Sequence, residues 1–226
     1  MSSIVVIAIL HTAGGESRQT VIDALGKVAS YSKENEPGIL RHATTVPRDV
    51  SDDKTLYVIE EYADQAAFDS HMAAKPTTEM IANFGANPSL FSAESEIIMA
   101  EPSSSFKRPE CAKATDPFIA YASIDYKEGT RDEALQGWKG VASATQDNES
   151  DTLSYAIMKN KGNSVNVCTF EVYTDEDFFR KVHAPSKAVQ ENRAKYGTEY
   201  RTSFTGALLK LAAGYLHREE KVTSIL

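Results

Sequence analysis

The chain has 226 residues, of which 42% are hydrophobic and 25% charged, and its formal net charge is −8 at pH 7. This length fits one large domain or two domains of about 110 residues, and the composition is typical of a globular protein. The negative charge argues against nucleic-acid binding, which needs a clustered basic surface, and gives no attraction to an anionic membrane.

Cysteine usage and the apolar segments predict the cellular location. Cys111 and Cys168 are far apart, which indicates a reducing compartment without structural disulfides. The apolar run at residues 4–10 has no basic flank, so it is predicted to be a strand and not a secretion signal. No run is long enough to span a bilayer. We therefore expect a cytoplasmic protein that does not bind membranes.

The first half of the sequence predicts the order strand, helix, strand, strand, helix, strand. A continuous β-branched run predicts that the first strand is buried on both faces. The first helix, at residues 17–33, has an apolar stripe, and the second begins after Asp64 and ends or kinks at Pro76. The four strands are expected at residues 4–10, 39–46, 56–62 and 93–101.

One strand–corner–helix unit occurs twice, which indicates an internal duplication. In the first half it lies within Leu56–Ile81, where an apolar strand is followed by an acidic corner and a short helix. Four residues recur at a constant offset of 111: Glu60, Tyr62, Asp64 and Phe68 match Glu171, Tyr173, Asp175 and Phe179. The chain is therefore expected to contain two copies of one module.

The second half is expected to repeat the element order of the first half. A linker rich in Pro and Ser is predicted at residues 102–117. A helix stripe that includes Ala134 and Trp138 follows the first strand of this half. The strands are predicted at residues 118–125, 153–158 and 167–173 and near 214–218, with an extra helical turn at 207–211.

Two βαββαβ units of this size predict an α+β protein of two ferredoxin-like modules, at residues 1–101 and 118–226. Helices would cover one face of each antiparallel sheet and leave the other face bare. The first strand of each half is apolar at nearly every position, so both of its faces need cover. We expect the two sheets to pack against each other as an internal pseudo-dimer, an intramolecular dimeric α/β barrel of eight strands.

The duplicated motif resembles that of antibiotic-biosynthesis-monooxygenase (ABM) domains, which belong to the dimeric α+β barrel superfamily and include quinol monooxygenases. The family pattern is a strand ending in Glu-x-aromatic-x-Asp/Ser, then an Ala/Phe pair and a His on the helix. In the second half the counted position of this His falls on Val182, and His183 comes one residue late. This departure favours one working pocket, in the first half. The first half has the whole pattern, at Glu60, Tyr62, Asp64, Ala67, Phe68 and His71.

The resemblance implies a monooxygenase that uses no metal and no flavin. In this family an electron-rich phenol, anthrone or quinol is deprotonated, and the substrate anion passes an electron to O2. The protein supplies an apolar pocket, a base or hydrogen-bonding group, and exclusion of water. The sequence has no nucleotide-binding glycine loop, no CxxC and no HExxH. We expect a small hydrophobic or aromatic substrate and O2 as partners, no cofactor or metal, and further pairing of the chain as a homodimer.

The candidate catalytic residues are His71 and His42. His71 is interpreted as a base or hydrogen-bond partner, or else as a helix histidine bonded to a strand carbonyl or to Glu60. Strand alternation puts His42 on the same face as Leu40, and its counterpart in the second half is Tyr155. Polar rings at equivalent inward positions of both halves indicate a pocket that binds substrate, with ordinary packing as the alternative.

Four further residues are candidates for substrate contacts. Trp138 is the only tryptophan and lies on a helix stripe, where core packing is the alternative to substrate stacking. Tyr62 is also interpreted as a corner residue that ties strand to helix. Tyr121 resembles Tyr155 in its strand position, and His183 is also interpreted as a helix end.

Two alternatives to a cofactor-free monooxygenase are open. One is another enzyme of the same superfamily, such as a haem-degrading oxygenase, a decarboxylase or an isomerase, because the fold supports many chemistries. The other is a non-catalytic module that binds a small molecule or assembles. An apolar pocket lined by His42, His71 or Tyr155 would favour an enzyme, whereas sheets packed solid between side chains would favour the non-catalytic module.

Overall fold

Each half of the chain forms a four-stranded antiparallel sheet from the predicted alternation of strands and amphipathic helices. The structure is a computed structural model that describes residues 3–218. The first half contributes β1 (Ile4–His11), β2 (Ile39–Pro47), β3 (Thr55–Tyr62) and β4 (Glu96–Lys107). The second half contributes β5 (Phe118–Tyr126), β6 (Thr152–Asn160), β7 (Asn166–Tyr173) and β8 (Arg201–Tyr215).

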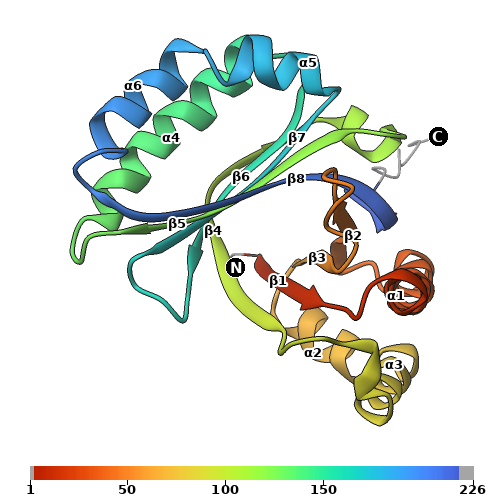
Figure 1. Cartoon of the computed structure of the whole chain (residues 1–226). Coiled ribbons are helices and arrows are strands. Elements are labelled where there is room, and N and C mark those ends of the chain that lie inside the picture. The colour runs from red at the N-terminus through yellow and green to blue at the C-terminus, as the bar shows by residue number, and fades with distance from the viewer. Residues whose placement is uncertain (1–2, 219–226) are drawn as a thin grey trace, which may run out of the picture.

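The helices lie on the outside of the two sheets, one group over each half (Figure 1). The first sheet carries α1 (Gly15–Asn35), α2 (Gln65–Ala73) and α3 (Lys75–Ala86). The second carries α4 (Arg131–Asn148), α5 (Glu176–Phe178), a π-helical turn (Phe179–His183) and α6 (Lys187–Tyr196). Short 3-10 turns occupy Pro88–Leu90 and Pro109–Lys113. Among the described residues, no helix has the length and apolar character needed to cross a membrane.

The two sheets join edge to edge into a closed barrel, in the order β1-β3-β2-β8-β5-β7-β6-β4. Within each half the order is that of a ferredoxin-like sheet, with the last strand beside the first. Two ladders cross between the halves: β2 pairs with β8, and β4 pairs with β6. The predicted intramolecular eight-stranded barrel is confirmed, and its closure leaves no edge strand in either sheet.

Two predictions about individual segments, the linker and the extra helical turn, are wrong. The expected linker at residues 102–117 begins too early, because β4 continues to Lys107 and pairs with β6 over this stretch. The expected helical turn at residues 207–211 is strand, since β8 runs unbroken from Arg201 to Tyr215 between β5 and β2. Ladder hydrogen bonds on both sides of a strand outweigh the local helix preference of its Ala and Leu residues.

Side chains fill the barrel interior. One buried apolar cluster draws members from all eight strands and none from an α-helix, which places it inside the barrel. Ile7 of β1 and Ile59 of β3 are opposite each other in the ladder, and both are fully buried in this cluster. Separate clusters join the outer faces of the sheets to the helices, as Val58 of β3 packs with Val21 and Leu25 of α1. Each sheet therefore has one face toward the barrel interior and one toward its own helices.

Candidate functional site

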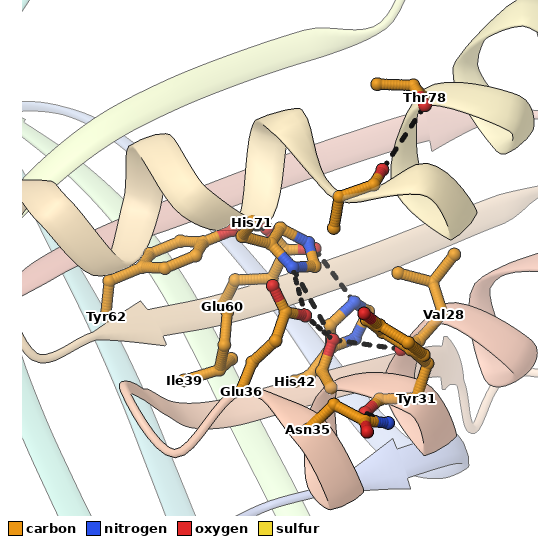
Figure 2. Close-up of polar contacts among 12 residues, drawn as sticks. Val28, Tyr31, Asn35, Glu36, Ile39, His42, Glu60, Tyr62, His71 and Thr78 are labelled. Carbon is orange, nitrogen blue, oxygen red and sulfur yellow. Dashed lines mark hydrogen bonds and ion pairs between the residues drawn. The ribbon is translucent and has the colours of Figure 1, made fainter.

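A buried polar cluster lies in the first half between the sheet and α2, and it is centred on His71 (Figure 2). Helix α2 begins just after β3 because Asp64 caps it, accepting a hydrogen bond from Ala67 N at 2.9 Å. His71 is 2% exposed, and its Nδ1 lies 2.9 Å from Oε2 of Glu36, which follows the last turn of α1. Ser32 Oγ donates to the same carboxylate oxygen at 2.8 Å. Glu36 therefore fixes the orientation of the His71 ring.

His42 and Glu60 complete this cluster from the sheet. They face each other in the ladder between β2 and β3, with His42 Nε2 3.2 Å from Glu60 Oε1. The hydroxyl of Tyr62 donates to the other oxygen of Glu60. Neither ring nitrogen of the fully buried His42 makes a hydrogen bond of acceptable geometry, including the one near Glu60. Burial lowers the pKa of His42 despite the nearby Glu60 carboxylate, which favours the neutral imidazole.

The two histidines of the cluster are close neighbours. The ring centroids of His42 and His71 are 5.7 Å apart, in an edge-on arrangement (Figure 2). Each of His42, Glu60 and His71 offers a nitrogen or carboxylate oxygen, and these three atoms lie within 4.8 Å of one another. The structure thus brings the two candidate histidines, His42 of β2 and His71 of α2, into one cluster. His71 also bonds to Glu36 instead of the predicted strand carbonyl or Glu60.

The second half contains a matching cluster around His183. His183 is 3% exposed, and its Nδ1 lies 2.7 Å from Oε2 of Glu149, which follows α4 as Glu36 follows α1. Tyr173 OH donates to Glu171 at 2.7 Å, as Tyr62 does to Glu60. Tyr155 takes the place of His42, with its ring centroid 5.4 Å from that of His183. The halves therefore share the carboxylate–histidine pair, and Tyr155 replaces the second imidazole in the second half.

A π-helical turn places His183 in its cluster. The register of the first half puts the histidine at Val182, but that side chain is 44% exposed. The wider turn at Phe179–His183 takes up the extra residue, so that His183 points inward as His71 does. Single-residue insertions into helices commonly produce such turns. The one-residue delay in the motif therefore does not remove the histidine from the second cluster, and it does not by itself distinguish the two halves.

In the second cluster Tyr173 donates a hydrogen bond to Glu171, whereas the hydroxyl of Tyr155 is buried without a hydrogen-bond partner. Burial raises the pKa of Tyr155 and of Tyr173 well above the ordinary value, and the negative charge of Glu171 adds to the effect. Burial likewise raises the pKa of Tyr62, with Glu60 as the next cause. These phenols stay protonated at neutral pH. The second cluster therefore has phenol O–H groups around one histidine, whereas the first cluster has a second imidazole.

Sequence reasoning missed the carboxylates that hold the two histidines. Neither Glu36 nor Glu149 is among the predicted site residues. A signal was present, because Ser32 and Glu36 recur as Thr145 and Glu149 at a constant offset of 113 residues. This offset differs from the 111 of the strand–corner motif, since the intervening loops differ in length. The helix ends of the two halves therefore align only at the offset of 113 residues.

Two other candidate residues lie away from both clusters. Tyr121 faces the barrel interior, where its hydroxyl donates to Cys168 Sγ at 3.8 Å and its ring lies 5.3 Å from that of Tyr57. Trp138 Nε1 donates to Tyr126 OH at 2.8 Å beneath α4, within the apolar core of the second half. Both side chains therefore have structural partners, and the candidates occupy four separate places in the molecule. The predicted inward positions of His42 and Tyr155 face the helices and not the barrel interior.

One of the pockets described for residues 3–218 adjoins the first cluster. A groove of about 440 Å³ runs between α1 and α3, and Val28 and Met80 are among its lining residues. The carbonyl oxygen of Val28 lies 2.9 Å from Ser32 Oγ, so the groove adjoins the first cluster. A smaller pocket of about 200 Å³ at one end of the barrel is lined by Arg41 and Lys107, among others. None of the pockets described for residues 3–218 is lined by His42, His71 or Tyr155.

Comparison with known proteins gives one family match, to part of the first half, and several similar folds. Residues 3–83 match the family model described as antibiotic biosynthesis monooxygenase. No curated protein matches the sequence.

The structure is similar over nearly its whole length to solved structures of proposed monooxygenases. One from Lactobacillus acidophilus has 18% sequence identity and a TM-score of 0.77, with 96% of this chain and 99% of that chain covered. One from Fusobacterium nucleatum has 18% identity and a TM-score of 0.78, with 97% and 99% covered. An anthrone oxidase-like protein has 10% identity and a TM-score of 0.67, with 100% and 97% covered. At these identities the likeness shows the fold alone.

Proposed function

We propose that this chain, whose residues 3–83 match the antibiotic biosynthesis monooxygenase family, consists of two ABM-like modules and is a monooxygenase with its working site in the first half. The proposed substrate is a small aromatic compound of the quinol or anthrone type, or a related hydrophobic metabolite. The proposed reaction uses no cofactor, because the deprotonated substrate reduces O2. The buried His71–Glu36 pair beside His42 is the observation that carries this proposal.

The geometry supports a base at His71. Its Nδ1 is bonded to Glu36, which leaves Nε2 to take a proton from a substrate hydroxyl. The Glu36 carboxylate would stabilise the imidazolium that forms. His42 and Tyr62 both contact the Glu60 carboxylate, and they hold it beside His71. The cluster thus has the base–orienter arrangement that proton abstraction requires.

The proposed oxygen chemistry balances without an external reductant. An anthrone loses a proton to His71, and its anion passes one electron to O2. The resulting carbon radical and superoxide combine to a peroxide, which then eliminates water. One oxygen atom replaces the two hydrogens of the reacting carbon as a carbonyl, and the other leaves in water. O2 takes up the four electrons that this carbon loses.

The groove between α1 and α3 is the proposed entrance for the substrate. It is lined in part by apolar side chains, and its Val28 carbonyl oxygen lies 2.9 Å from Ser32 Oγ of the cluster. His71 is 2% exposed, so the substrate can reach it only if α2 and α3 move. The two helices meet at Ala74, which has an extended backbone conformation between them. This junction is the proposed hinge.

Oxygen consumption by metal-free protein tests the proposal. A panel of quinols and anthrones would be supplied with isotopically labelled O2, and the products would be read by mass spectrometry. We expect uptake on at least one substrate, with one labelled oxygen atom in the product. His71→Ala should lose this turnover while its melting temperature stays near that of the wild type, with His71→Gln as a second variant. Normal turnover by both folded variants would reject His71 as the base.

A non-catalytic module that binds small molecules is the second candidate function. It is favoured by the filled barrel interior and by the burial of both His42 and His71. This candidate predicts that some panel members raise the melting temperature while none causes oxygen uptake. Uptake with incorporation of labelled oxygen would reject it.

A further inference from the structure

His42, Glu60 and His71 converge from three different elements on one buried point. They come from β2, β3 and α2, and their candidate ligand atoms lie within 4.8 Å of one another. His42 Nε2 and Glu60 Oε1 are 3.2 Å apart. Two ligand atoms on one tetrahedral Zn²⁺ are about 3.3 Å apart, given metal–ligand bonds of about 2.0–2.2 Å. The His42–Glu60 pair therefore already has the required spacing, and the ligand atom of His71 has to move closer to bind the same ion.

The hydrogen bonding of His42 also indicates a missing partner. Its side chain is fully buried, and neither ring nitrogen makes a hydrogen bond. Buried polar groups in folded proteins nearly always have a partner, and one without a partner needs an explanation. A metal ion on Nε2 would supply that partner, and Glu60 would provide the negative charge beside it.

The groups around the cluster have the arrangement that supports metal ligands elsewhere. Metal-bound histidines usually donate their other ring N–H to a carboxylate, and Glu36 holds Nδ1 of His71 in this way at 2.9 Å. Ser32 in turn holds Glu36 at 2.8 Å. Tyr62 donates to one oxygen of Glu60 and leaves Oε1 on the side of His42.

We propose that His42, Glu60 and His71 bind one divalent transition-metal ion of the Zn²⁺ type. Two imidazoles and one carboxylate form a common ligand set for Zn²⁺. The ion would occupy the proposed base, so it acts as an inhibitor of the oxygenation proposed above and not as its cofactor. This last consequence rests on the proposed function, whereas metal binding itself does not.

The second half provides an internal control for this proposal. It has the equivalents of Glu36, Glu60 and His71 in Glu149, Glu171 and His183. It has Tyr155 in place of His42, and its protonated phenol is a poor ligand for Zn²⁺. The full chain should therefore bind one ion with high affinity, in the first half.

Calorimetric titration of the tag-free, chelator-stripped full chain with Zn²⁺ tests the inference, with Co²⁺ absorption as the readout of the ligand field. We expect one ion per chain. His42→Tyr, which copies the second half, should abolish this binding, with His42→Gln as a second variant. Glu36→Gln should weaken binding about 10–100-fold, the usual effect of losing a carboxylate behind a histidine ligand. Tyr155→His should raise the stoichiometry to two.

Two outcomes would overturn the inference: no binding by the wild type, or binding that the folded His42 variants retain. Melting temperatures measured without metal show whether each variant is folded. The titration contains no substrate, so its result is independent of turnover. Metal binding without oxygen uptake would reject only the proposed function, and oxygen uptake without metal binding would reject only this inference.

Discussion

Single residues decide how the two halves differ. Both halves bury a histidine against a carboxylate, as His71 with Glu36 and His183 with Glu149. Only the first half adds a second imidazole, because the position of His42 is taken by Tyr155 in the second. The first cluster therefore contains two imidazoles, whereas the second contains one imidazole and a phenol. The asymmetry lies in this substitution and not in the register of the helix.

The carboxylate of Glu149 should make stability depend on pH. Burial alone would raise its pKa, but the hydrogen bonds with His183 and Thr152 outweigh burial and lower it below the ordinary 4.5. A lowered pKa stabilises the folded state above the unfolded value, and this contribution is lost as pH falls through the folded value. Glu149→Gln should cost about 1–3 kcal/mol at pH 7.

Urea unfolding of wild type and Glu149→Gln at a series of pH values measures this effect. The difference in unfolding free energy should be largest above about pH 5 and should shrink as the pH falls below about 4. A difference that is constant with pH would show that the ionised carboxylate contributes nothing to stability. Glu149→Asp keeps the charge and serves as the control for the titration.

At the scale of secondary-structure elements, the π-helical turn is the device that keeps the duplicated site intact. It accommodates one extra residue between Asp175, which caps the helix by accepting from Phe178 N, and His183. In the first half the corresponding helix is regular from Gln65 to Ala73. Because of this turn, His183 has the same position in its cluster as His71, although it comes one residue later in the motif.

Deleting the exposed Val182 should convert this π turn into ordinary α-helix. His183 would then take the spacing from its cap that His71 has, so the folded protein should keep the Glu149 contact and nearly the wild-type stability. Deleting the exposed Ser70 from the regular helix α2 is the control, since it turns His71 away from Glu36. Equal destabilisation by the two deletions would contradict this account of the π turn.

Helices α4 and α6 pack closely because Gly137 has no side chain. A Cβ at this position would lie 2.2 Å from Tyr196 Cε2 and 2.3 Å from Asn192 Oδ1. Gly137→Ala should therefore destabilise the fold by about 1–3 kcal/mol through overpacking. Gly140→Ala in the same helix meets no atom within 4 Å and should stabilise by about 0.5–1 kcal/mol. Thermal or urea unfolding of the two variants should show opposite signs, and matching signs would contradict the packing argument.

At the scale of the whole molecule, the two halves form one barrel and complete each other's sheets. The β2–β8 and β4–β6 ladders supply the two seams, and the interior cluster draws on both halves. Arg218, after the last strand, donates to the carbonyls of Ser32, Lys33 and Glu36 at the end of α1. The end of the second half thereby stabilises the helix end that carries the first cluster.

We expect the two halves to unfold together, because neither sheet can keep its interior face covered alone. The single tryptophan, Trp138, lies in the core of the second half, so its fluorescence reports that half. Far-ultraviolet circular dichroism reports both halves. The two denaturation curves should coincide in one transition. A separate second transition by either probe would show that the halves are independent domains.

Much of this architecture was predictable from the sequence, because burial leaves a periodic trace. The apolar runs of β1 and β5 and the repeated Glu-x-Tyr-x-Asp corner indicated a duplicated ferredoxin-like fold and the closed barrel. The extent of β8 was not predictable, since its Ala and Leu residues have no clear period and only its two partner strands make it a strand. His42, Glu60 and His71 meet only through tertiary contacts, so no sequence spacing predicted their cluster.

Oxygen consumption by His71→Ala and His183→Ala, compared on any substrate that the wild type oxidises, tests the central claim most directly. The two variants remove equivalent buried histidines from the two clusters, so each controls for the structural cost of the other. His71→Ala should lose about 10²–10⁴-fold in turnover, the usual contribution of a general base, while folded His183→Ala keeps most of it. Equal losses, or a larger loss in His183→Ala, would contradict a working site in the first half.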